Sequence, residues 1–191
     1  MKLQPTEVLT EDKFWQIIET SLKTSNNLYP TLDEQQELLV SELKKLSIKE
    51  IIAYDCIFGD LKHKAYKQDL WAVAYIVMGG CSDDGFMDFR NWLITRGKNV
   101  FYKALKDADS LNEEFNKIQA EDMPSWEEVS YLPMGVIEEE FEKDFDEEAT
   151  KYNFEYSKEP EINFEWEEDN EESMRAVCPD TFDQWWCNDK F

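Results

Sequence analysis

The chain has 191 residues, of which 43 are acidic and 20 are basic, and its formal net charge is −23. This length suffices for one substantial hydrophobic core and is short for two, so we expect one domain, with at most an appendage. Phosphate groups are bound mainly through Lys and Arg, and the chain has only three arginines. Direct binding to nucleic acid or to an anionic membrane surface is therefore not expected.

The acidity is concentrated in the last third of the chain. From Glu121 onward there are 24 acidic and 5 basic residues, a net charge of −19, whereas residues 1–120 carry a net charge of −4. A basic protein is the natural partner for such a charge distribution. No apolar run reaches the roughly 18 residues needed to cross a bilayer, and the N-terminus lacks a signal-peptide pattern. The sequence therefore predicts a cytoplasmic protein without membrane contact.

The front part of the chain is predicted to form helices joined by short turns. Thr10 precedes apolar residues at i, i+3 and i+4 spacing, which is typical of a capped amphipathic helix. Thr31 or Asp33 opens a second helix, and a third is expected from about Ile48 to Tyr66. Further short helices are expected between residues 100 and 120.

Eight consecutive apolar residues run from Leu70 to Val77 and end at a pair of glycines. The run is too continuous for a surface helix, so we place it at the centre of a helical bundle. A buried β-strand is the competing interpretation because Val, Tyr and Ile favour strands, but no other segment offers a strand to pair with it. The sequence thus predicts an all-α fold, a compact bundle of about six to eight helices.

From Pro124 onward the pattern changes. Ser125 is predicted to be a helix cap, and a long acidic helix is expected after a break at Pro133–Gly135. A last helical turn is expected to begin at Asp180.

The domain organisation follows from this change of pattern. Glutamates alternate with aromatic residues over 153–172 without a helical period. We therefore expect a helical domain over residues 1–152 and an acidic, aromatic C-terminal arm over residues 153–191, packed on or beside it.

The segment GGCSDDG raises the question of whether it is a reactive loop or a helix start. Gly79 and Gly80 suit the left-handed conformation that ends a helix, and Ser82 suits an N-cap. Asp83 and Asp84 would then lie in the first turn, at the positive end of the helix dipole. As the alternative, the two aspartates could be metal ligands or acid–base groups, but no accompanying ligand motif is present. Helix capping is the favoured interpretation.

Two charged residues stand on otherwise apolar helix faces. Arg90 takes the i+4 position after Phe86, and Asp55 takes the same position after Ile51 on the helix expected from about Ile48 to Tyr66. A lone buried charge costs several kcal/mol, so we predict a buried ion pair between Asp55 and Arg90, with Asp69 or Asp88 as alternative partners for the arginine.

Other candidates for chemistry are few. His63 lies between lysines and has no serine or cysteine partner in the local sequence, so a role as a catalytic base is not favoured. Cys81 lies next to a predicted helix start without a basic neighbour and is interpreted as a packed thiol. No Cys-x-x-Cys pair and no glycine-rich phosphate motif occurs. We therefore expect no metal and no cofactor.

Several of these motifs together resemble a known family. The stretch DLWAVAYIVMGGCSDDGFMDFRNWLITRG, the pair Phe14–Trp15 and the segment VFYKALKDADSL are similar to the bacterial domain-of-unknown-function family 4240. The resemblance covers roughly residues 10–145 and departs from the family pattern after about Asn153. It implies one mainly helical bacterial domain, and it implies no activity, substrate or catalytic residue.

Two functions are the main hypotheses, and a regulatory module in a larger bacterial assembly is a third, less favoured one. The first is a non-enzymatic module of the inhibitor or immunity type that binds a basic protein through the acidic C-terminal third. Its expected contact residues are Glu138, Glu139, Trp166, Trp185 and Trp186. The alternative is an enzyme or small-ligand receptor. Its polar pocket would lie between the helix of Leu70 to Met78 and the helix of Phe86 to Thr95. Its expected lining residues are Asp55, Trp71, Asp83, Asp84 and Arg90.

Overall fold

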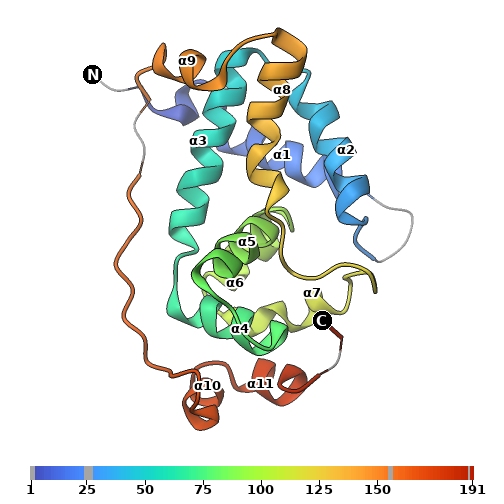
Figure 1. Ribbon diagram of the computed structural model, residues 1–191, viewed down its shortest axis with the longest axis vertical. Helices are drawn as coiled ribbons and strands as arrows, with labels where there is room; N and C mark the ends of the chain where they lie inside the picture. The colour runs from blue at the N-terminus through green and yellow to red at the C-terminus, as the bar shows by residue number, and fades with distance from the viewer. Residues whose placement is uncertain (1–2, 24–27, 155–156, 189) are drawn as a thin grey trace.

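The fold is helical throughout the part of the chain that the computed structural model describes, residues 3–23, 28–154, 157–188 and 190–191 (Figure 1). The α-helices are α1 (Glu11–Ser21), α2 (Leu32–Leu43), α3 (Ile48–Lys64), α4 (Gln68–Met78), α5 (Asp83–Ile94), α6 (Lys98–Ala104), α7 (Asn112–Phe115), α8 (Leu132–Phe141), α9 (Phe145–Thr150), α10 (Glu171–Val177) and α11 (Pro179–Trp185). Three short 3-10 helices are η1 (Pro5–Glu7), η2 (Ala108–Leu111) and η3 (Glu128–Tyr131). The all-α prediction is confirmed.

The predicted number of helices was too low, since these residues form eleven α-helices. The excess comes from short pieces in the second half of the chain, of which α7 has 4 residues and α9 has 6. No helix in the described part of the chain is long and apolar enough to cross a membrane.

Hydroxyl side chains begin the first three helices. Thr10 accepts a hydrogen bond from the third backbone N–H of α1. Thr31 and Ser47 each form a capping box, with Glu34 and Glu50 returning the hydrogen bond to the cap residue. Each box satisfies two backbone donors that the helix cannot pair internally. Of the two residues predicted to open α2, Thr31 is therefore the one that does so.

Helix α4 lies in the lower half of the molecule in Figure 1, between α5 and the pair α10 and α11. All residues from Leu70 to Val77 except Tyr75 are buried, so the apolar run is a helix covered on nearly every side and the competing strand interpretation is wrong. Gly79 ends the helix with φ of 66°, a left-handed conformation that glycine adopts without a steric cost.

The other half of the molecule is built from α1, α2, α3 and α8. Helix α8 packs against both α2 and α3, and Figure 1 shows it standing between them. Phe14 is fully buried beneath α3, where its ring lies 4.7 Å from that of Tyr54 and 6.4 Å from that of Phe58. One hydrophobic cluster runs from this region through α4 and α5 to the last helix.

The acidic region around α8 differs from the prediction in two ways. Pro133 does not break the helix, because it occupies the first turn, where its missing N–H has no partner to lose. The predicted long helix is instead interrupted after Phe141, where Glu142 takes a left-handed conformation with φ of 52°. Asp144 then caps a separate helix, α9, by accepting from the N–H of Glu147 at 2.8 Å.

Ser125 is not a helix cap, which corrects a further prediction. The segment around it is pinned to α5 by its neighbour Trp126, whose N–H donates to the carbonyl of Asp88 at 3.0 Å. The carbonyl of Trp126 accepts from the side chain of Asn91 at 3.1 Å. The next helical turn, η3, begins three residues after Ser125.

Residues 157–170 form an extended strap, drawn in orange at the edge of Figure 1, without helix or strand. The strap follows the length of α3 and leads to α10 and α11, which pack on α4. It connects the α9 end of the molecule with the opposite end.

Candidate functional site

Arg90 is buried, with 5% of its surface exposed, and its partners come from three segments. Its guanidinium donates to the carbonyl of Lys62 at the end of α3 (3.1 Å) and to the carboxylate of Glu159 in the strap (3.2 Å). The ring of Tyr66 lies 4.7 Å from the guanidinium carbon, and the ring of Phe86 lies 4.9 Å from it. Carbonyls, a carboxylate and two ring faces are all favourable surroundings for a cation.

The predicted ion pair between Asp55 and Arg90 is wrong, because the carboxylate that pairs with Arg90 is Glu159. The reason is geometric. Arg90 meets α3 at Lys62, seven residues after Asp55, which corresponds to about 10 Å along a helix axis. The alternative partner Asp69 forms an ion pair with Lys67 instead, at 2.9 Å.

We expect Glu159→Gln to loosen the strap. The Arg90 side chain is 6% exposed and that of Glu159 is 46% exposed, so solvent screens the pair and its contribution is of the order of 1 kcal/mol or less. Hydrogen exchange in residues 157–165 should therefore become about two- to fivefold faster. Glu161→Gln, an exposed neighbour without an ion pair among the described residues, is the control. Equal acceleration of exchange in both variants would contradict a role of the Arg90–Glu159 ion pair in holding the strap.

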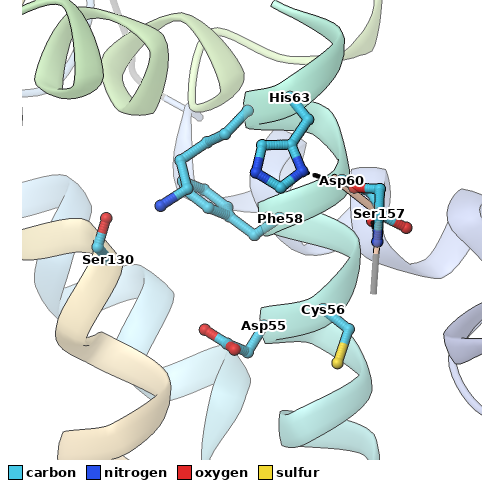
Figure 2. Close-up of a pocket in the computed structure, with 9 residues that line it drawn as sticks. Asp55, Cys56, Phe58, Asp60, His63, Ser130 and Ser157 are labelled. Carbon is cyan, nitrogen blue, oxygen red and sulfur yellow. Dashed lines mark hydrogen bonds between the residues drawn. The ribbon is translucent and has the colours of Figure 1, made fainter. Parts of the chain in front are cut away.

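A polar cavity of about 110 Å³ lies between α3, η3 and the strap. Asp55, Gly59 and Lys62 share one face of α3 at i, i+4 and i+7 spacing and form one wall. Figure 2 shows Ser130 across from Asp55, while Ser157 lies beside His63 at the other end. The remaining lining residues are Cys56, Phe58 and Asp60.

Burial disfavours the charged forms of Asp55 and Lys62 in this cavity. Burial raises the pKa of Asp55 to about 6, although the nearby ammonium of Lys62 opposes the increase. Burial also lowers the pKa of Lys62, an effect that the charge of Asp55 opposes. The hydroxyl oxygen of Ser130 is buried without a hydrogen-bond partner among the described residues. The cavity therefore offers a carboxyl group, an amine and a hydroxyl to a small polar occupant.

His63 has a serine partner that the local sequence did not reveal. Its Nδ1 lies 2.6 Å from the hydroxyl oxygen of Ser157, and Figure 2 marks this contact. The distance fits a serine–histidine pair, but a catalytic pair also needs a third group that orients the imidazole. Asp60 does not take that part, because its carboxylate accepts from the backbone N–H of Ser157 at 3.1 Å. Both contacts fasten the strap to α3.

Asp83 and Asp84 are exposed in the first turn of α5 and do not line the cavity beside Asp55. Ser82 caps this helix by accepting from the N–H of Gly85 at 3.2 Å, so the capping interpretation of the segment is confirmed. Cys81 precedes the cap, and burial raises the pKa of its thiol to about 12, as expected for a packed cysteine.

Two of the three tryptophans predicted to contact a partner face the interior. Trp166 and Trp185 are 6% and 2% exposed, so neither side chain projects outward to insert into a partner, which corrects that expectation. Trp185 packs edge-on against Phe115, with ring centroids 5.6 Å apart. Trp186 is partly exposed and donates its indole N–H to Glu171 at 3.1 Å.

Most carboxylates of the C-terminal third face outward, although Glu148 is buried. Glu138 and Glu139 are exposed on α8, and the strap and the start of α10 add a run of exposed acidic residues. These residues are Glu161, Glu165, Glu167, Glu168, Asp169, Glu171 and Glu172. From Glu121 onward, ion pairs within the described residues involve four carboxylates, those of Glu140, Glu148, Glu159 and Asp183.

A second buried arginine was missed by the sequence analysis. Arg96 is 3% exposed and donates to the side chains of Gln35 and Thr95. The ring of Tyr29 lies 4.4 Å from its guanidinium carbon, and the hydroxyl of Tyr29 donates to Glu114. Burial lowers the pKa of Arg96 to about 10. This group is a polar connection between α2, the end of α5 and α7.

The sequence profile of the family described as "Protein of unknown function (DUF4240)" matches residues 9–139. The chain belongs to this family. Searches of curated proteins and of solved structures give no match. The DUF4240 region contains α1 to α7 and most of α8, and therefore Asp55, His63 and Arg90. Ser157 and Glu159, which complete the surroundings of His63 and Arg90, lie outside the matched residues.

Proposed function

We propose that this DUF4240 protein is a non-enzymatic binding module that recognises a basic protein through the acidic surface of its C-terminal third. The observation that carries the proposal is the exposure of the carboxylates along the strap, most of which lack an ion-pair partner among the described residues. Such a surface accelerates encounter with a cationic partner and repels anionic ones. A role of the inhibitor or immunity type is the specific form that we propose.

The competing explanation is that the negative charge serves only to keep the chain dispersed in water. A binding surface differs from a dispersing one because it requires charge at particular positions. Binding should therefore depend on where carboxylates are removed, and not only on how many are removed.

The test measures binding of an acetylated and amidated decalysine peptide at 20 and 300 mM salt. Glu138→Gln, Glu139→Gln, Glu161→Gln and Glu165→Gln together should weaken binding about tenfold at low salt. The matched control removes four exposed charges from the front part of the chain: Glu19→Gln, Asp33→Asn, Glu37→Gln and Glu113→Gln. Equal losses in both variants, or no binding at low salt, would contradict the proposal.

A small-ligand site or enzyme remains the second candidate, now at the cavity that Asp55 and His63 line. The contact between His63 and Ser157 favours it. The cavity volume of about 110 Å³ is well below the roughly 300–1,000 Å³ of drug-sized ligand sites, which restricts the occupant to a small polar molecule or ion. Covalent labelling of Ser157 by a serine-reactive fluorophosphonate, lost in His63→Ala, is the expected result for catalysis.

A further inference from the structure

An aromatic pocket of about 260 Å³ lies where the strap crosses α4. Its walls are the rings of Trp71 from α4 and of Phe164 and Trp166 from the strap. The carboxylate-bearing residues Glu167 and Glu168 complete the lining. The pocket is separate from the polar cavity beside Asp55, since the two share no lining residue.

The three rings pack edge to face against one another at the side of this volume. The centroids of Trp71 and Phe164 are 5.2 Å apart with an interplanar angle of 71°, and those of Phe164 and Trp166 are 5.8 Å apart with an angle of 80°. The face of each aromatic ring carries a partial negative charge, so rings set at steep angles around one volume attract a cation. Two carboxylates at the same place add to that attraction.

The walls are fixed before any ligand arrives. The indole N–H of Trp71 donates to the carbonyl of Cys81 at 3.0 Å, and that of Trp166 donates to the carbonyl of Gln68 at 2.9 Å. One face of Trp71 is stacked on the buried ring of Phe86 at 4.6 Å. Because both indoles have satisfied their polar groups internally, their exposed parts act as apolar walls, and little ordering is needed on binding.

The lysines and arginines that the structure describes leave this pocket open. Within the described residues, lysines and arginines lie over many other aromatic rings, but over none of the three rings that form the pocket. Glu167 and Glu168 likewise form no ion pair in the described part of the chain. The negative potential of the pocket is therefore not neutralised from within.

We propose that this aromatic pocket receives the ammonium group of a lysine side chain on the basic protein partner. The inference rests on the proposed function and locates its central contact. The volume is smaller than that of typical cofactor sites, so a single side chain fits better than a larger ligand. A pocket lined by steeply angled rings suits a compact ammonium, whereas a planar guanidinium prefers to stack flat on one ring.

The test titrates acetylated and amidated pentalysine into the full chain and measures the dissociation constant by calorimetry. Phe164 is 49% exposed, so Phe164→Ala removes one wall without opening the core, and binding should weaken about fivefold. Tyr131 is 52% exposed on η3, away from the pocket, so Tyr131→Ala is the matched control and should change binding less than twofold.

A second pair of variants separates position from charge. Glu167→Gln with Glu168→Gln should weaken binding more than Glu138→Gln with Glu139→Gln, although each pair removes two adjacent exposed carboxylates. If Phe164→Ala matches Tyr131→Ala while binding still decreases with salt, the pocket assignment is overturned and the proposed function stands. If pentalysine does not bind at low salt, both are overturned.

Discussion

Phe86→Ala is expected to lower the free energy of unfolding by about 3–5 kcal/mol, the range for removing a fully buried aromatic side chain. Phe86 is 0% exposed and lies between Trp71, whose ring stacks on it at 4.6 Å, and the guanidinium of Arg90, 4.9 Å from its ring. Its loss leaves a cavity and removes one of the aromatic faces that surround a buried cation. Chemical denaturation monitored by circular dichroism measures the change.

The control for this variant is the same substitution at an exposed phenylalanine. Phe164→Ala should cost less than about 1 kcal/mol, because the side chain is 49% exposed. Similar losses at Phe86 and Phe164 would show that Phe86 does not have the central packing role described for it. Phe86→Ala should also weaken pentalysine binding, since Trp71 loses the ring that supports it.

Asp55→Asn is expected to stabilise the protein at pH 7.5 by roughly 2–3 kcal/mol and to have little effect at pH 4. Burial raises the pKa of Asp55 from 3.8 to about 6 in the folded chain. The folded state therefore holds this proton more tightly than the unfolded state. The stabilising contribution of the protonated carboxyl is complete below pH 4, decreases as the pH rises toward 6, and is absent above that.

Asparagine resembles the protonated carboxyl at every pH, which is why its advantage should develop only as the wild-type carboxyl ionises. Urea denaturation of both proteins at pH 4, 5, 6 and 7.5 measures the difference. A difference between variant and wild type that stays constant over this range would contradict the assigned burial of Asp55. A higher free energy of unfolding for Asp55→Asn at pH 7.5 would also show that the ionised Asp55 carboxylate destabilises the wild-type protein. Such destabilisation is common for polar groups at functional sites.

Helix starts and the central helix were predictable because their signals are local. Thr31 and Ser47 each precede a glutamate at the third helical position, so the capping box is contained in four residues. The burial of Arg90 was also predictable, since it continues the apolar face begun by Phe86. The same spacing from Trp92 would have indicated Arg96, which the sequence analysis passed over.

The partners of Arg90 and His63 were not predictable, because these contacts join residues that are far apart in the sequence. Glu159 is 69 residues from Arg90, and Ser157 is 94 residues from His63. Both lie in a strap without periodicity, where no pattern assigns a side chain to the inside or the outside. A count of charges likewise could not distinguish Glu159, which is paired, from Glu161, which has no ion pair among the described residues.

The docking of α10 and α11 on α4 also determines when the chain can fold during synthesis. Cys178 and Trp185 are 1% and 2% exposed, so the cover over the apolar α4 is supplied by residues made more than 90 positions after that helix. At about 5–20 residues per second, several seconds separate the emergence of these two parts from the ribosome. During that interval a nascent chain exposes apolar surface that chaperones recognise.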